Sequence, residues 1–220
     1  MINIRAKKTS RIEKFADAMT HGVGLFFSLL AFVVLFVMAA FTQDVYKIVG
    51  LNVYGVSLVS TYLASTMYHL YLFYHPVPNK QFRRFLLLFD HCSIFLLIAG
   101  TYTPILLIFV RNQLGLLIFS SIWFLTLAGI VYKFLYIGRF RRFSLFMYAI
   151  MGWAIVIAIN DLIKMVPMQL LSMLLLGGFF YTVGIIFFQN NRLPFSHSIW
   201  HIFVLIGSLI HFFGLLIYAI

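Results

Sequence analysis

The sequence predicts an all-α integral membrane protein with seven transmembrane helices. Apolar residues make up 63% of its 220 residues, and only 10% are charged. A water-soluble protein needs more polar surface than this to cover its core. The apolar residues are gathered into long runs with short polar breaks between them, and the basic residues lie almost entirely in the breaks. These observations indicate that lipid surrounds most of the chain.

Each apolar run has roughly the 20 residues with which a helix crosses about 30 Å of hydrocarbon. We expect helices at residues 22–41, 48–72, 85–109, 114–134, 142–160, 168–188 and 197–219. The first run is too long for the apolar core of a signal peptide, so we expect no cleavage. Four glycines are expected to let helices pack closely: Gly177, Gly178, Gly207 and Gly214. Residues 21–220 are therefore predicted to form one seven-helix domain.

A basic segment, residues 1–20, precedes the first span and contains five Lys and Arg residues. Within it Ile12, Phe15, Ala16 and Met19 recur at helical spacing. We therefore expect a cytoplasmic segment in which a short helix could lie on the membrane surface.

The basic residues also predict the orientation, because loops on the cytoplasmic side carry an excess of Lys and Arg. Thirteen lie in the N-terminal segment and around the breaks after the second, fourth and sixth spans, whereas only Lys47, Arg111 and Lys164 lie in the other breaks. A cytoplasmic N-terminus and an extracellular C-terminus follow, which excludes the arrangement of G-protein-coupled receptors. None of the basic residues forms a stripe along a helix, so the net charge of +11 does not indicate nucleic-acid binding.

Ionisable groups inside a membrane are costly, and they are candidate functional residues wherever a span contains one. On the predicted topology several of them converge on one layer near the inner leaflet. His69 lies near the end of the second span, Asp90 near the start of the third, and His21 at the start of the first. His197 and His201 open the seventh span in the same layer.

The spacing within this layer suits a metal ion. His197 and His201 are four residues apart, so they project from one helix face about one turn from each other. Such a pair can bind Zn²⁺, and His69 could supply a third nitrogen, leaving one position for water as in catalytic zinc sites. Zinc lowers the pKa of bound water from about 15.7 towards 7, so Asp90 is predicted to be the general base. Ser65, one turn before His69, could bond the water or a substrate oxyanion.

Spacing alone leaves a second interpretation open, in which interfacial histidines bond neighbouring helices or reach towards the headgroups. His211 lies about 15 Å deeper than the pair, so we expect a helix-packing hydrogen bond for it instead. His75 is expected to be solvated in a loop, and His91 to point about 100° away from Asp90 around its helix. Cys92 is the single cysteine, so no intramolecular disulfide can form, and we expect it to be a small buried apolar group.

Four segments at these residues follow one another across nearly the whole chain. They are Glu13 to the Thr20-His21-Gly22 turn, Ser65-Thr66-Met67-Tyr68-His69, Asp90 with the stretch to Gly100-Thr101-Tyr102-Thr103-Pro104, and His197-Ser198-Ile199-Trp200-His201 with the continuation to His211. In these segments and their order the sequence closely resembles the bacterial hemolysin III family, a branch of the progestin and adipoQ receptor superfamily.

The resemblance implies a seven-helix fold with a cytoplasmic N-terminus in a bacterial plasma membrane. It also implies a buried zinc site with His69, His197 and His201 as ligands. By the same motifs Asp90 would bind the ion through water, with Ser65 beside it. Relatives in the superfamily such as adiponectin receptors and alkaline ceramidases resemble zinc-dependent lipid amidases.

Three functions remain open on these grounds. The first is a zinc hydrolase that cleaves an amide or ester of a membrane lipid, because lipid carbonyls lie near the depth of the site. The second is a non-enzymatic sensor or receptor of membrane homeostasis, in which zinc serves structure and the basic face attracts anionic lipid. The third is a pore-forming cytolysin, which needs polar side chains through the full membrane depth. Membrane lipids are the expected partners, and the sequence identifies neither a protein partner nor an oligomeric state.

Overall fold

The structure, a computed structural model, describes residues 10–139, 141–190 and 192–220, and all regular elements in these ranges are helices. In chain order they are α1 (Arg11–Thr42), α2 (Val45–Tyr74), α3 (Lys80–Ile108), α4 (Gln113–Tyr136), α5 (Arg141–Trp153), the short 3₁₀ helix η1 (Ala154–Ala158), α6 (Ile159–Met165), α7 (Met168–Gln189) and α8 (Ser196–Tyr218). Within the described ranges seven segments are long and apolar enough to cross a membrane, with α5, η1 and α6 together forming the fifth. The prediction of an all-α fold with seven such segments is confirmed.

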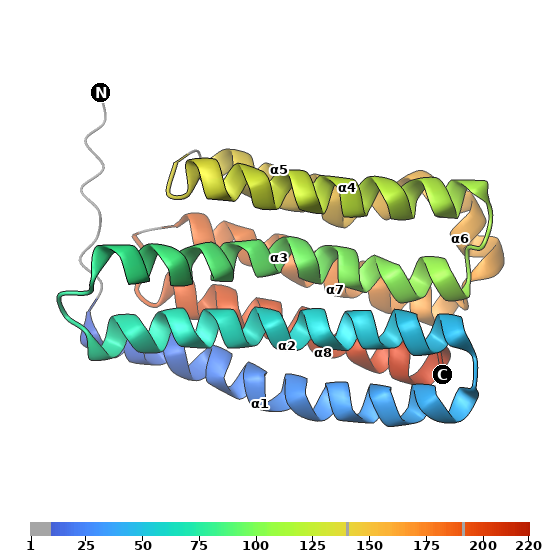
Figure 1. Cartoon of the computed structure of the whole chain (residues 1–220), viewed down its shortest axis with the longest axis horizontal. Coiled ribbons are helices and arrows are strands. Elements are labelled where there is room, and N and C mark those ends of the chain that lie inside the picture. The colour runs from blue at the N-terminus through green and yellow to red at the C-terminus, as the bar shows by residue number, and fades with distance from the viewer. Residues whose placement is uncertain (1–9, 140, 191) are drawn as a thin grey trace.

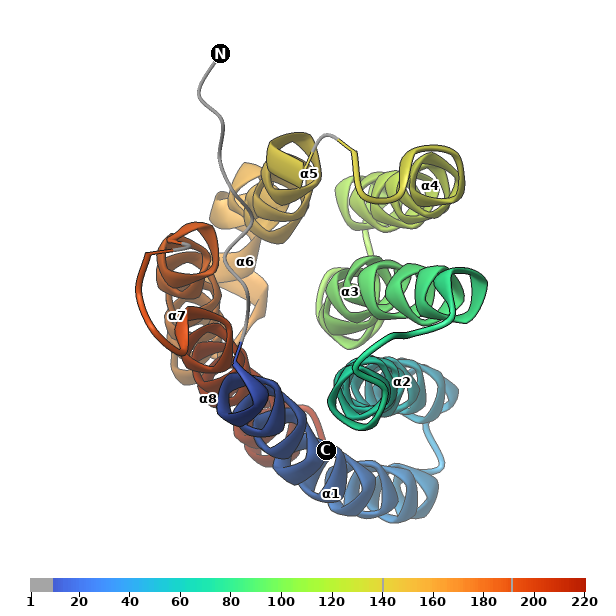
Figure 2. The same cartoon turned by 90° about the vertical axis from the view of Figure 1, so that its left-hand side faces the viewer.

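The long helices lie side by side and alternate in direction along the chain (Figure 1). Seen along their axes they are arranged in a ring, in which α8 packs against both α7 and α1 (Figure 2). Phe41, Leu116 and Phe124 are among many large apolar side chains exposed on the surface, as expected where lipid replaces water. Helices α1, α3, α5 and α8 begin at the same end of the bundle, which we call the basic end because most of the described Lys and Arg residues lie there.

Helix α1 begins earlier than the first expected span. Ser10 Oγ accepts a hydrogen bond from the Glu13 backbone N–H (3.1 Å), and the Glu13 carboxylate accepts one from the Ser10 backbone N–H (2.8 Å). This capping box starts the helix at Arg11. Residues 11–20 are therefore the first turns of one continuous helix instead of a separate one. The rest of the basic segment, residues 1–9, lies outside the described residues, and its place on the membrane surface stays a prediction.

The fifth span differs from the single helix expected over residues 142–160, because the helix is interrupted by η1. The Tyr102 hydroxyl of α3 reaches into this break. It lies within donating distance of the Met151 and Gly152 carbonyl oxygens (2.8 and 3.1 Å) and accepts a hydrogen bond from the Ile155 backbone N–H (2.7 Å). Backbone groups in hydrocarbon need partners within the protein, so a side chain from another helix makes the interruption possible.

Helices α7 and α8 approach each other closely at glycines. A Cβ atom on Gly177 would clash with the His211 imidazole, and one on Gly207 would lie 3.0 Å from the Gly177 carbonyl oxygen. His211 Nε2 lies 3.0 Å from the Leu174 carbonyl oxygen, which confirms the helix-packing hydrogen bond expected for it. Gly178 behaves differently, because a Cβ there would meet no atom of the described chain closer than 3.9 Å.

Candidate metal centre

Three histidines from two helices converge at the basic end of the bundle. His69 lies in the last turns of α2, and His197 and His201 lie in the first two turns of α8. One ring nitrogen from each lies within 4.8 Å of those of the other two. Among the described residues, no other three His, Cys, Asp or Glu side chains form a group with this geometry. His69 and His201 are buried, whereas His197 is half-buried. The convergence predicted from the sequence is confirmed.

The geometry of the group fits a zinc ion. Two nitrogens bound to tetrahedral zinc at about 2.0–2.1 Å lie roughly 3.3 Å apart. The Nε2 atoms of His69 and His197 are 3.2 Å apart. A nitrogen–nitrogen hydrogen bond has a similar length, so the second ring nitrogen of each histidine helps to distinguish the two interpretations.

The surroundings of His201 determine which of its nitrogens carries the proton. Its Nδ1 lies 2.9 Å from Thr20 Oγ1 and 3.2 Å from the Asp17 carbonyl oxygen. The Thr20 hydroxyl donates its own hydrogen to the carbonyl oxygens of Ala16 or Asp17 (2.9 and 3.0 Å), so towards His201 it acts as an acceptor. Nδ1 of His201 is therefore the N–H donor, and Nε2 keeps a lone pair for a metal ion.

Asp17 on α1 lies next to His69, on the side of its ring that carries Nδ1. Its Oδ2 lies 4.0 Å from His69 Nδ1, and its Oδ1 accepts a hydrogen bond of 2.5 Å from Ser198 Oγ. The Asp17 side chain is buried, as are those of both neighbours. A carboxylate behind a ligating histidine fixes the ring orientation and makes the ligating nitrogen more basic. The position of Asp17 therefore favours Nε2 of His69 as the nitrogen that faces the ion.

Asp17 was not among the residues predicted from the sequence. The pattern that would have found it is the spacing of Glu13, Asp17 and His21, which are four residues apart and so share one face of a helix. This spacing indicates a functional helix face only if residues 11–21 belong to the transmembrane helix, and in α1 they do.

Glu13, for which the sequence indicated no role, connects α1 to the start of α8. Its Oε1 accepts a hydrogen bond of 3.1 Å from the backbone N–H of Phe195. Phe195 adopts a left-handed backbone conformation with φ of 55° and precedes the first residue of α8. By holding this turn Glu13 contributes to the position of His197, two residues further along the chain.

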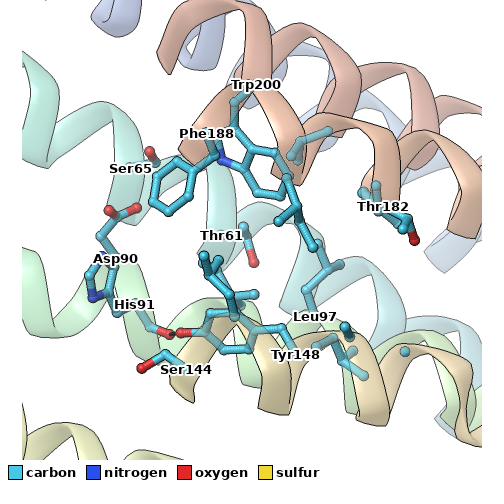
Figure 3. Close-up of a pocket in the computed structure, with 18 of the residues that line it drawn as sticks. Thr61, Ser65, Asp90, His91, Leu97, Ser144, Tyr148, Thr182, Phe188 and Trp200 are labelled. Carbon is cyan, nitrogen blue, oxygen red and sulfur yellow. Dashed lines mark hydrogen bonds between the residues drawn. The ribbon is translucent and has the colours of Figure 1, made fainter. Parts of the chain in front are cut away.

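Asp90 and Ser65 lie with the histidines at one cavity, which has a volume of about 410 Å³. Ser65 and Asp90 both line this cavity, and Figure 3 shows them at the same end of the pocket. His197 and His201 line the same cavity. The predicted base, the predicted hydroxyl and two of the three predicted ligands are thus brought to one space.

His21 also faces this cavity, but its nitrogens are not part of the three-histidine group. Its ring lies against that of His201, with 3.6 Å between the ring centroids. Neither ring nitrogen of His21 has a hydrogen-bond partner in the described part of the chain, although both are buried. His21 is therefore available to bond a water molecule or a ligand beside the three histidines.

Away from the basic end the cavity is lined mainly by apolar side chains of α3, α5, α7 and α8. Partway along the cavity Trp153 Nε1 donates a hydrogen bond of 3.0 Å to Thr182 Oγ1, and both of these lining residues are exposed on the surface of the bundle. Gly138 and Arg139, in the connection between α4 and α5, line it at the basic end. A cavity with this course can accept a long apolar chain whose polar end lies beside the histidines.

Substituting Asp17 by asparagine is expected to lower the affinity for zinc by about ten- to a hundredfold, because such supporting carboxylates contribute this much elsewhere. Titration against a chromophoric chelator measures the affinity. Ser198→Ala is the matched control, since it removes the hydrogen bond to Asp17 Oδ1 but leaves the carboxylate near His69, and it should have the smaller effect. An Asp17→Asn protein with the affinity of the wild type would contradict the assigned role.

Known proteins resemble this chain over most of its length. The family described as "Haemolysin-III related" matches residues 10–212, a range that includes every residue of the site. The chain is 43% identical over 208 residues to "Hemolysin-3" of Bacillus cereus, covering 94% of this chain and 92% of that protein. It is 40% identical over 208 residues to "Hemolysin-3 homolog" of Bacillus subtilis (strain 168), covering 94% and 95%. To the human "Monocyte to macrophage differentiation factor" it is 25% identical over 175 residues, covering 79% and 72%.

Proposed function

The chain belongs to the haemolysin-III-related family, and from this premise we propose that it is a zinc-dependent hydrolase that cleaves an amide or ester bond of a membrane lipid. The observation that supports the proposal most is the convergence of three imidazoles, two of which line a cavity that also holds the Asp90 carboxylate and the Ser65 hydroxyl. Beyond this polar end the cavity is apolar, and its volume of about 410 Å³ lies within the range of small-molecule sites.

His69, His197 and His201 would hold the ion, which when bound supplies a Lewis acid and a water molecule whose pKa is lowered towards 7. Asp90 would act as the general base, taking a proton from the attacking water and returning it to the leaving nitrogen or oxygen. Ser65, which lines the cavity beside Asp90, would orient the Asp90 carboxylate. His21, with both ring nitrogens unbonded in the described part, can bond a polar atom of the substrate.

The name "Hemolysin-3" describes the Bacillus cereus relative, and a pore would be one way to account for it. A pore needs polar side chains along its whole length. In this chain the ionisable residues that line the cavity lie mostly at the basic end, and most of the remaining lining is apolar. The cavity supports binding of a lipid chain better than conduction of ions.

A direct test supplies purified protein with lipid amides and esters and measures released fatty acid by mass spectrometry. Release is expected with zinc bound, is expected to stop after chelation, and should return when zinc is added back. If protein with a full complement of zinc released no fatty acid from either class of lipid, the hydrolase would be rejected. A zinc-stabilised sensor of the membrane would then be the better account.

We also propose that the basic end faces the cytoplasm of a bacterial cell, since Lys and Arg are concentrated there. His75 is exposed in the connection between α2 and α3 at this end, and Lys164 is exposed at the opposite end. A membrane-impermeant maleimide is expected to label Lys164→Cys protein in intact cells, and His75→Cys protein only after the cells are opened. The native Cys92 is buried and provides an unlabelled background. Labelling with the reverse pattern would invert the topology.

A further inference from the structure

A buried lysine lies at the same cavity and has no part in the hydrolysis described above. Lys133, in the last turn of α4, is only 4% exposed. Its Nζ donates a hydrogen bond of 2.7 Å to Ser144 Oγ on α5 and lies 3.4 Å from His91 Nδ1 on α3. The ammonium also lies over the Tyr148 ring, 5.6 Å from its centroid. All these neighbours are neutral side chains from other helices, or in the case of His91 neutral when its Nδ1 accepts the bond.

The neighbours of Lys133 are themselves held in place. The Tyr148 hydroxyl donates a hydrogen bond of 2.9 Å to the His91 carbonyl oxygen, and Figure 3 shows Tyr148 and His91 joined in this way with Ser144 beside them. Ser144 is buried, with 2% of its surface exposed. An ammonium group has three N–H donors, and Ser144 and His91 account for two. The third remains for a group in the cavity.

The charges around the cavity are not balanced. Lys133 and Arg139 line it, and Asp90 is the single carboxylate among its described lining residues. No described Asp or Glu residue forms an ion pair within 4.0 Å of Lys133, and Asp90 interacts with it only at longer range. Two more positive charges would come with a zinc ion. A buried ammonium is costly without a negative partner, so the cavity is suited to a ligand that brings one.

We propose that Lys133 binds the anionic group of the lipid that enters this cavity, a phosphate or a carboxylate, and so selects anionic lipids over neutral ones. Ser144 and His91 direct the ammonium, and Arg139, which is exposed at the same end, attracts the negative charge from outside. Lysine is a common binder of phosphate oxygens as a point charge. The identification of the ligand as a substrate rests on the proposed function, but the binding itself does not.

Equilibrium binding to purified protein in a neutral detergent tests the proposal without turnover. Three probes with the same number of carbon atoms are compared: hexadecyl phosphate, palmitate and hexadecanol. Wild-type protein is expected to bind an anionic probe about ten- to a hundredfold more tightly than hexadecanol, the range expected for a charged hydrogen bond. Lys133→Met should lose this preference and keep its affinity for hexadecanol. Whichever anionic probe binds more tightly identifies the source of the oxyanion as a phosphate headgroup or a fatty-acid end.

Several variants separate binding by Lys133 from other effects. Lys133→Arg keeps the charge and should retain much of the preference, whereas Lys164→Met, at an exposed lysine of the opposite end, should not change it. If Lys133→Met does not fold, Ser144→Ala leaves the charge but releases the ammonium, and it should reduce the preference several-fold. The proposal is wrong if wild-type protein shows no preference, or if the preference survives in Lys133→Met.

A control without zinc keeps this inference separate from the hydrolase. His201→Ala protein is expected to lack zinc and turnover, yet it should still prefer the anionic probes. Loss of hydrolysis with an intact preference would therefore remove the proposed function and leave the lysine site standing. A preference that disappears in His201→Ala but survives in Lys133→Met would place the oxyanion on the metal and overturn the proposal.

Discussion

Replacement of His201 by alanine is expected to reduce the zinc content of the purified protein from close to one ion per chain to near zero. The substitution removes one of three imidazoles and leaves His69 and His197 alone, so the affinity should fall by more than the roughly hundredfold that a supporting residue costs. Elemental analysis after extensive dialysis measures the content. His211→Ala is the matched control, because His211 is a buried histidine of the same helix that bonds Leu174.

The same proteins distinguish a catalytic ion from a structural one. Zinc that binds only the folded state stabilises it, so the unfolding temperature of the wild type should rise with zinc concentration and that of His201→Ala should not. If His201→Ala remains folded without zinc, the ion is not required for the fold, as expected for catalysis. Retention of zinc by His201→Ala would show that the ligands are wrongly assigned. Absence of zinc from carefully handled wild type would remove the basis of the hydrolase.

The spans could be predicted from the sequence because a helix in lipid needs a long apolar run, and each run here is bounded by polar residues. The interruption of the fifth span could not be predicted in this way. Its backbone groups are satisfied by the hydroxyl of Tyr102, a residue of α3 about fifty positions away from Met151. Hydropathy along the chain is uniform through η1. The side chain that permits the interruption belongs to another helix and leaves no mark in the local sequence.

The metal ligands could be predicted because depth in the membrane follows from topology alone. Residues distant in sequence share a layer once the direction of each helix is known, and His69, His197 and His201 do converge. Asp17 was missed because the basic segment was assigned to the membrane surface, whereas the capping box at Ser10 makes it part of α1. Depth also did not show which side of a helix faces inward, so His21 was placed in the right layer without a partner or a role.

The burial of Lys133 also could not be predicted from the sequence. From the sequence its charge was counted only towards the orientation of the chain, together with the arginines of the following connection. In the structure it is a buried residue of α4 that faces Ser144, His91 and the cavity. A basic residue in the last turn of a span can either reach the headgroups or turn into the bundle, and packing of neighbouring helices decides between them.

Replacement of Asp90 by asparagine is expected to leave zinc bound and to lower lipid turnover by about a hundred- to ten-thousandfold, the range of a lost general base. Asparagine has the same shape but cannot take a proton from water. Measured kcat with zinc content determined on the same sample separates the two effects. Ser65→Ala keeps the carboxylate and removes only the neighbouring hydroxyl, so its decrease should be about tenfold or less.

The comparison of the Asp90 and His201 variants defines the role of the carboxylate. If Asp90→Asn loses turnover but keeps zinc, the carboxylate acts in proton transfer. If His201→Ala loses both turnover and zinc, the imidazole acts in metal binding. If Asp90→Asn also lost its zinc, the carboxylate would be a metal ligand, and the base would have to be sought elsewhere in the cavity. His21 would then be the first residue to test, because it faces the same space with both nitrogens unbonded in the described structure.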